Sequence, residues 1–283
     1  MKIALTGASG FIGRHVLNRL LQQELEIIAV TRNARKLSEF GSALRVVEMD
    51  IARPTPDCFE QLGCPEVLLH LAWDGLPNYQ SLHHFETELP KQYQFLKLLI
   101  QAGLKSLLVT GSCFEYGRQS GELSESLPAR PDNAYGYAKD ALRLQLQFLK
   151  TAHPFNLTWA RLFYMYGTGQ PETSLYPKVM QAILQKDEVF NMSGGAQLRD
   201  YLPVAEVAEI LVQLAVKPQD IDVLNVCSGV PVSVRQQVEM WLKAQHSNLR
   251  LNLGYYPYPD YEPMAFWGDR RKLDSLQDSP YGT

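Results

Sequence analysis

The first structural unit of the chain is encoded by KIALTGASGFIGRHVLNRLL, residues 2–21. The run Lys2–Thr6 is apolar and predicts a buried strand, and the apolar residues that recur from Phe11 onward follow the spacing of a helix face. Glycines between the two allow a tight turn, close approach of a pyrophosphate to the backbone, and close packing of helix on strand. This order predicts a dinucleotide site at the helix N-terminus, formed by Gly7, Gly10, Phe11, Ile12 and Gly13.

The first half of the chain continues to alternate between apolar runs and helical patterns. Further strands are predicted at Glu26–Val30, Leu44–Met49, Val67–Leu71, Ser106–Thr110 and Leu157–Phe163. A long helix is predicted over Leu82–Ala102, and another where Tyr135 and Lys139 stand. Alternation of this kind indicates βαβ units, so the expected fold class is α/β, a Rossmann-like doubly wound parallel sheet.

After the sixth strand, strands and helices no longer alternate regularly. This change predicts a smaller C-terminal region. We therefore assign residues 1–163 to a dinucleotide-binding domain and residues 164–283 to a substrate-binding region, interleaved with the first so that part of it returns to the sheet. The helices and strands expected in this region are Tyr176–Gln185, Val189–Asn191, Val204–Val216, Val223–Cys227 and Val234–Ala244.

The end of the second strand bears on which dinucleotide is bound. An acidic residue about 20 positions after the glycines would hold the ribose 2′-hydroxyl of NAD. Here the chain reads TRNAR, with Arg32 and Arg35 and no acid. Because arginine can hold phosphate oxygens in a bidentate fork, this favours NADP. NAD or dual use stays open, since both arginines could be solvated loop charges.

A candidate acid/base group lies between Ser112 and Lys139. Tyr135 and Lys139 are four residues apart, a spacing that puts both on one face of a helix. A lysine ammonium beside a phenol favours phenolate, so we expect the pKa of Tyr135 to fall below its usual value of about 10. Ser112 follows the fifth strand and supplies a hydroxyl at the same sheet edge. The alternative is an ordinary exposed tyrosine–lysine pair.

Composition excludes several classes of function. A net charge of −3 and a pI near 6.1 argue against a nucleic-acid partner. The four cysteines form no C-x-x-C pair, and His83 and His84 lack a third ligand and are expected at the surface, so we expect neither a metal site nor a disulfide framework. The N-terminus lacks a signal-peptide pattern and no run is long enough to span a membrane, which favours the cytoplasm.

Motifs along nearly the whole chain resemble the extended short-chain dehydrogenase/reductase family, whose members include nucleotide-sugar epimerases, dehydratases and reductases. The motifs are TGASGFIG, HLAW, the S-x-x-x-YG of Ser112–Gly117, YGYAK, RLFYMYGTGQ, LRDYLPVAEVA, LNVCSGVPVSV and AFWGDRRKLDSL. The resemblance implies a nucleotide-sugar substrate bound by the C-terminal region, and a homodimer.

The resemblance also implies roles for single residues. Asp50 and Ile51 would contact the adenine end of the cofactor, and Ala72 would lie near its nicotinamide ribose. Ser112 would hold the substrate carbonyl, Tyr135 would exchange the proton, and Lys139 would bind the ribose and tune Tyr135. Substrate contacts would come from Ser112, Cys113, Tyr164 and Arg199, the last at a position that usually meets the nucleotide diphosphate.

Departures from the family pattern narrow the expected reaction. Dehydratases of the family carry Asp-Glu after the serine or threonine, whereas this chain has Cys113 and Phe114. The segment GSCFEYGRQSG looks most like that of bacterial reductases of dTDP-4-keto-6-deoxyhexoses, which form dTDP-6-deoxy-L-talose or dTDP-D-fucose. The leading hypothesis is therefore NAD(P)H-dependent reduction of a C4 ketone. An epimerase that retains NAD is the second hypothesis, and a non-catalytic dinucleotide sensor is the third.

Overall fold

The computed structural model describes residues 1–258 and 262–277. The chain divides into two compact units. The first comprises Met1–Gly117, Pro128–Leu162 and Ala205–Leu224, and the second comprises Arg118–Leu127, Phe163–Val204 and the chain from Asn225 onward. The chain thus leaves the first unit and returns to it twice before it ends in the second.

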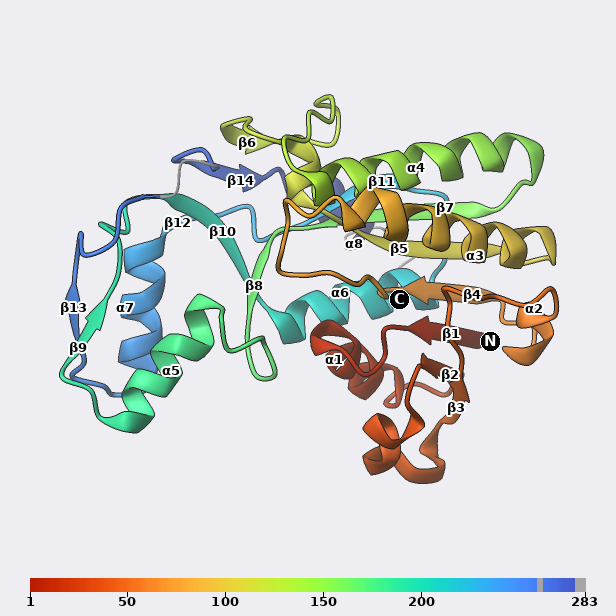
Figure 1. Ribbon diagram of the computed structural model, residues 1–283, viewed down its shortest axis with the longest axis horizontal. Coiled ribbons are helices and arrows are strands. Elements are labelled where there is room, and N and C mark those ends of the chain that lie inside the picture. The colour runs from red at the N-terminus through yellow and green to blue at the C-terminus, as the bar shows by residue number, and fades with distance from the viewer. Residues whose placement is uncertain (259–261, 278–283) are drawn as a thin grey trace. The chain divides into compact units, whose positions relative to one another are not determined.

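A seven-stranded sheet forms the centre of the first unit, with the strand order β11-β7-β5-β4-β1-β2-β3 (Figure 1). Its strands are β1 (Lys2–Thr6), β2 (Glu26–Thr31), β3 (Arg45–Glu48), β4 (Val67–His70), β5 (Ser106–Ser112), β7 (Asn156–Leu162) and β11 (Asp222–Val226). Neighbouring strands are parallel all along the sheet from β3 through β2, β1, β4 and β5 to β7. This confirms the predicted Rossmann-like sheet. Its order reverses between β1 and β4, so the crevice for a ligand is expected where these two strands end.

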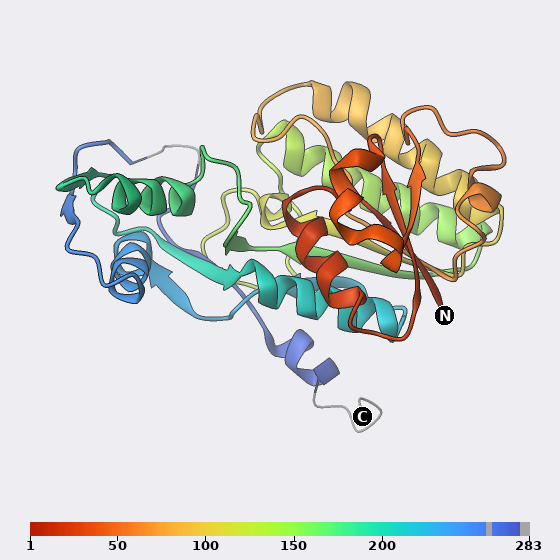
Figure 2. The same cartoon turned by 90° about the horizontal axis from the view of Figure 1, so that it is seen from below.

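Helices cover both faces of this sheet. Figure 2 shows α3 (Leu89–Gln101) and α4 (Ala134–Ala152) on one face, with α1 (Phe11–Leu20) and α6 (Val204–Val216) on the other. An ion pair joins α1 to α6, with Arg19 Nε 3.4 Å from Glu209 Oε2. Every residue of β4 and β5 is buried, as expected for strands covered on both faces. The short helical segments of this unit are η1 (Ala34–Ala43), α2 (Cys58–Gln61) and η3 (Cys113–Tyr116).

The predicted long helix over Leu82–Ala102 is two elements. A π-helical turn, η2 (His84–Glu88), precedes α3, and Pro90 stands in the first turn of α3. Proline has no N–H to donate to the preceding turn, which interrupts the regular hydrogen-bond ladder. The wider π turn buries His84 and Glu88. The expectation that His84 lies at the surface is therefore wrong.

The described part of the second unit contains short strands, three helices and its own core. Its strands pair as β8 with β10 and β10 with β12, as β9 with β13, and as β6 with β14. Their bounds are β6 (Gly121–Leu123), β8 (Tyr164–Tyr166), β9 (Val189–Asn191), β10 (Leu198–Pro203), β12 (Pro231–Ser233), β13 (Arg250–Asn252) and β14 (Phe266–Gly268). The helices are α5 (Leu175–Gln185), α7 (Val234–Ala244) and α8 (Arg271–Gln277). Trp241 and Leu242 of α7 pack with Val179 of α5 in the core.

Among the described residues, no helix is both long enough and apolar enough to cross a bilayer.

Candidate active site

The glycine turn joins β1 to α1 and leaves the start of that helix open. Gly7 has φ +70°, and its carbonyl accepts the Gly10 N–H at 2.9 Å. A Cβ on Gly13 would lie 2.1 Å from the Gly7 carbonyl oxygen, so a side chain cannot fit there. Gly10 caps α1 without a side-chain hydrogen bond, so free N–H groups at Phe11 and Ile12 can face an anion. The turn therefore fits a dinucleotide pyrophosphate.

Residues at the ends of β2 and β3 lie at the same edge of the sheet. Arg32 and Arg35 follow β2 and are exposed, and Arg32 makes an ion pair of 3.7 Å with Asp74 Oδ2. Asp50 and Ile51 follow β3, where the Asp50 carboxylate accepts the N–H of the next residue but one. These positions suit the adenosine half of a dinucleotide. The Arg35 N–H donates to Oδ1 of Asn33, the N-cap residue of η1.

A buried hydrogen-bond chain connects the end of β1 to η2. The Ala72 N–H donates to Thr6 Oγ1 at 3.3 Å, and Thr6 Oγ1 contacts His70 Nδ1 at 2.9 Å. His70 Nε2 meets Gln92 Oε1 at 2.7 Å, and Gln92 donates in turn to Glu88. Burial, with Lys139 nearby, lowers the pKa of His70 to about 3. The imidazole is therefore neutral, with Nε2–H donating to Gln92, and the chain fixes the backbone at Ala72.

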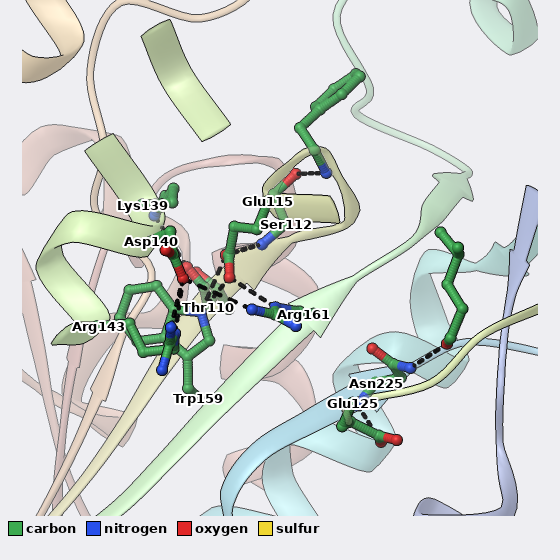
Figure 3. Close-up of polar contacts among 12 residues, drawn as sticks. Thr110, Ser112, Glu115, Glu125, Lys139, Asp140, Arg143, Trp159, Arg161 and Asn225 are labelled. Atoms are coloured by element: carbon green, nitrogen blue, oxygen red, sulfur yellow. Dashed lines mark hydrogen bonds and ion pairs between the residues drawn. The ribbon is translucent and has the colours of Figure 1, made fainter. Parts of the chain in front are cut away.

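Ser112, Tyr135 and Lys139 come together at the end of β5. Ser112 is the last residue of that strand, and the other two lie in the first two turns of α4. All three are buried, and the Ser112 side chain lies near enough to Tyr135 to favour its phenolate form. Lys139 Nζ donates to the Thr110 carbonyl at 2.9 Å (Figure 3). Asn133 caps α4 by accepting the N–H of a first-turn residue, which fixes where the helix begins.

Burial decides the charge states of this group. It raises the pKa of Tyr135 well above its usual value, and the nearby Ser112 side chain only partly opposes the shift. The expected lowering of the Tyr135 pKa is therefore wrong for this arrangement. Burial also lowers the pKa of Lys139 to about 7, although the carboxylates of Glu115 and Glu88 oppose the shift. The phenol is thus a neutral proton donor, and the lysine titrates near neutrality.

Glu115 lies beneath Ser112 and was missed as a site residue. Its carboxylate accepts the Ser112 N–H at 2.7 Å, Trp159 Nε1 at 3.0 Å and Arg161 Nε at 2.7 Å (Figure 3). Glu115 and Arg161 are fully or almost fully buried, and Arg161 lies 3.7 Å from a second carboxylate, Asp140. The S-x-x-E spacing from Ser112 to Glu115 is the signal that could have revealed it, because that spacing forms a capping box.

An aromatic shell surrounds the Tyr135 ring. Ring centroids lie 5.2 Å away for His84, 5.7 Å for Tyr79, 5.9 Å for Trp73 and 6.5 Å for Phe114. The Tyr135 N–H also donates to the Tyr79 carbonyl at 3.0 Å. The loop between β4 and η2 therefore helps to form the surroundings of the phenol, a role that no local sequence pattern indicated.

A group of possible metal ligands lies at the outer end of this loop. Ligand atoms of Asp74, His83 and Glu88 are all within 4.8 Å of one another. Glu88 Oε1 accepts the Lys91 ammonium at 2.8 Å and lies 3.4 Å from His83 Nε2. The protein thus already balances the charge of this carboxylate with its own cation.

The candidate substrate residues divide between the two units. Cys113 follows Ser112 and is buried in the first unit. Tyr164 and Arg199 belong to the second unit, where both hold Glu262. Arg199 Nη2 lies 2.8 Å from Glu262 Oε2, and its guanidinium also stacks 4.6 Å from the Phe266 ring. The arginine expected to meet a diphosphate is therefore paired with an internal carboxylate.

We expect Glu115→Gln to destabilise the protein by about 3–5 kcal/mol, because it keeps the side chain's shape but leaves Arg161 as a buried charge with weaker compensation. The free energy of unfolding from urea titration measures this. Glu239→Gln, which removes one partner of an exposed ion pair with Arg235, is the matched control and should cost at most about 1 kcal/mol. Equal losses in both variants would contradict the structural role of Glu115.

The pKa of Lys139 predicts a pH-dependent effect of Lys139→Met. Between pH 7 and the lysine's usual pKa of about 10.4, the unfolded chain binds a proton at this position that the folded protein does not, so folding gains stability as pH rises. Methionine removes this dependence. The stability of the variant relative to wild type should therefore fall from pH 6.5 to 9.5, by up to about 1.4 kcal/mol per pH unit. A constant difference across parallel urea titrations would rule out a buried titrating lysine.

The chain is similar to known proteins along most of its length. The model of the NAD dependent epimerase/dehydratase family matches residues 3–227. The dTDP-6-deoxy-L-talose 4-dehydrogenase (NAD(+)) of Aggregatibacter actinomycetemcomitans is 29% identical over 270 residues, which cover 95% of this chain and 99% of that protein. The GDP-6-deoxy-D-talose 4-dehydrogenase of the same organism is 26% identical over 290 residues, covering 99% and 92%.

Solved structures show the same fold. MoeE5 in complex with UDP-glucuronic acid and NAD superposes with a TM-score of 0.82 at 27% identity, covering 98% of this chain and 92% of that one. The family match includes the glycine turn, the end of β5 and the start of α4. Since it covers most of the chain, the protein belongs to the NAD dependent epimerase/dehydratase family.

Proposed function

We propose that the protein transfers hydride between a nicotinamide dinucleotide and C4 of a nucleotide-linked 6-deoxyhexose, acting as a reductase of the 4-keto sugar. The observation that carries this proposal is the burial of Ser112, Lys139 and a neutral Tyr135 phenol together at the sheet edge that also carries the glycine turn. A neutral phenol is the protonation state that reduction of a ketone requires, because the alkoxide formed must gain a proton.

Each of the three residues has a distinct role in this proposal. Ser112 donates a hydrogen bond to the C4 oxygen, where negative charge develops, and so stabilises the transition state more than the ground state. Tyr135 gives its proton to that oxygen. Lys139 supplies a titrating ammonium within the same buried group. The dinucleotide, when bound, supplies the hydride in reduction and accepts it in oxidation.

Two sets of residues would hold the two ligands. For the dinucleotide these are Gly7, Gly10, Phe11, Ile12, Gly13, Arg32, Arg35, Asp50, Ile51, Ala72, Tyr135 and Lys139. For the nucleotide sugar they are Ser112, Cys113, Tyr164 and Arg199. The open N-terminus of α1 and the glycines that exclude a Cβ support the dinucleotide assignment.

The relatives support the reaction class in either direction. Both talose relatives are named as 4-dehydrogenases, and oxidation of a C4 hydroxyl is the reverse of reduction of a C4 ketone. The same phenol serves as acid in one direction and as base in the other. We propose a dTDP-linked substrate, because the relative that acts on a dTDP sugar shares the higher identity.

An epimerase is the second candidate, because the family to which the chain belongs includes this activity. It would use the same three residues but regenerate its cofactor within one cycle. Purified protein would then carry tightly bound NAD and convert its substrate without added reductant. A reductase consumes one equivalent of reduced cofactor per product, so the stoichiometry separates the two.

The test is to incubate the protein with NADPH or NADH and a panel of nucleotide 4-keto-6-deoxyhexoses, and to follow cofactor absorbance and product identity. We expect stoichiometric cofactor oxidation with a dTDP-linked member. Tyr135→Phe should lower turnover about 10²- to 10⁴-fold while the dinucleotide still binds, because proton transfer is lost. Tyr137→Phe, an exposed tyrosine on the same helix, should keep wild-type turnover. Oxidation of neither cofactor with any member, or full turnover in Tyr135→Phe, would refute the proposal.

The two arginines after β2 predict cofactor preference. We propose that Arg35 binds the 2′-phosphate of NADP, since Arg32 already pairs with Asp74. Arg35→Gln should lower the ratio of kcat/KM for NADPH to that for NADH about 10- to 100-fold, because a charge-assisted hydrogen bond contributes about 1.5–3 kcal/mol. Arg32→Gln should lower it less. A wild-type enzyme that prefers NADH, with a ratio unchanged in Arg35→Gln, would show that NAD is the cofactor.

A further inference from the structure

The Lys139 ammonium lies between a carbonyl and an aromatic face. Nζ donates to the Thr110 carbonyl at 2.9 Å and lies 4.0 Å from the centroid of the Trp73 ring. Lys139 is 2% exposed, so this contact is shielded from water. A cation over an indole face is attracted to it, and the attraction is strongest where both groups are desolvated. Trp73 therefore replaces part of the hydration that the ammonium loses on burial.

A second residue holds the indole in place. Trp73 Nε1–H donates to His84 Nδ1 at 3.1 Å, and His84 Nε2 lies 2.9 Å from the Asn78 carbonyl oxygen. A carbonyl can only accept, so Nε2 carries the hydrogen and Nδ1 is the acceptor. Only a neutral imidazole in this one tautomer satisfies both bonds. The His84 side chain is fully buried at the start of η2, so neither partner is readily replaced by water.

The same imidazole also packs against the phenol. The His84 and Tyr135 ring centroids lie 5.2 Å apart, edge to face, and those of Trp73 and Tyr135 lie 5.9 Å apart. Trp73 therefore contacts both members of the Tyr135–Lys139 pair, and His84 contacts Tyr135 directly. Among the described contacts, neither residue forms a side-chain hydrogen bond to Tyr135 or Lys139. The two residues therefore act on the pair through packing and through the attraction between the ammonium and the indole ring.

We propose that Trp73 and His84 are positioning residues for the Tyr135–Lys139 pair: neutral His84 orients the indole, and the indole face holds the Lys139 ammonium beside Thr110. This inference rests on the proposed function only in so far as Tyr135 and Lys139 are taken to be catalytic. The placement of the ammonium is a property of the folded protein by itself.

The charges around His84 agree with a neutral ring. The titratable groups that face it are His83, Glu88, Lys139 and Tyr135. Burial lowers the pKa of His84, with His83 and Lys139 acting in the same direction, while the Asn78 carbonyl and Glu88 oppose the shift. Protonation would turn Nδ1 into a donor that faces the indole N–H, so the bond between the two rings requires the neutral imidazole.

The first experiment measures the Lys139 ammonium directly, without substrate. The ¹³Cε shift of Lys139, assigned by its absence in Lys139→Met, is followed against pH. Trp73→Leu removes the ring that favours the cation, so the midpoint should fall by about one pH unit. Trp73→Phe keeps an aromatic face and should give a smaller fall. A midpoint unchanged in Trp73→Leu overturns the inference.

The second experiment tests His84 with a conservative replacement. His84→Phe keeps a ring but loses both hydrogen bonds, whereas His84→Gln can still accept from the indole and donate to the Asn78 carbonyl. We expect His84→Phe to shift the Lys139 midpoint in the same direction as Trp73→Phe and to lower kcat about 10-fold, with His84→Gln restoring both. His84→Phe could instead lower the melting temperature while the Lys139 titration midpoint and the pH profile of kcat stay as in the wild type. That result would show that His84 has only a structural role, and it would overturn the inference.

The two experiments also separate this inference from the proposed function. If no nucleotide sugar is turned over but the midpoint moves in Trp73→Leu, the placement of Lys139 is supported and the proposed reaction fails. If turnover follows the proposal but neither the midpoint nor the pH profile of kcat moves in any of these variants, the positioning role fails alone. Should Trp73→Leu not fold, Trp73→Phe and His84→Phe carry the same test.

Discussion

The buried ion pair of Glu115 and Arg161 is the interaction on which the site depends. It joins the residues just after β5 to β7, the neighbouring parallel strand. Burying two charges is costly unless each is paired and its remaining hydrogen-bonding capacity is used. Glu115 meets this condition by also accepting from Ser112 and Trp159. Gly111 is required beside it, because a Cβ there would lie 2.2 Å from Trp159 Nε1 and 2.5 Å from Glu115 Oε1.

This constraint extends to the charge of Lys139. A buried ammonium without nearby carboxylates would be neutral at physiological pH. Glu115 and Glu88 both favour its charged form, the first from the end of β5 and the second from η2. The network that fixes the backbone of Ser112 therefore also keeps Lys139 close to its titration midpoint at neutral pH. Backbone geometry and electrostatics of the site have one common origin.

Local patterns predicted the frame of the molecule but not the interior of its site. The β1 strand, the glycine turn and the bounds of α6 and α7 follow from apolar spacing and from glycine, which act over a few residues. The split of the helix next to Pro90 comes from a proline that apolar spacing does not reveal, and the burial of His84 comes with contacts to Asn78 and Tyr135. The strands β6 and β14 pair across more than 140 residues, and neither was expected. The roles of Ser112, Tyr135 and Lys139 stay predictions.

The wrong prediction for the pKa of Tyr135 bears on the reaction. Helical spacing predicted that Lys139 would lower the pKa of Tyr135, but the lysine points to Thr110 and Trp73, and burial raises that pKa instead. A site that eliminates water needs a second acid or base beside the phenol. Cys113 and Phe114 offer none, and the carboxylate of Glu115 is committed to its three donors. Tyr135 is a neutral proton donor in this group, which agrees with the transfer of one hydride and one proton that we propose.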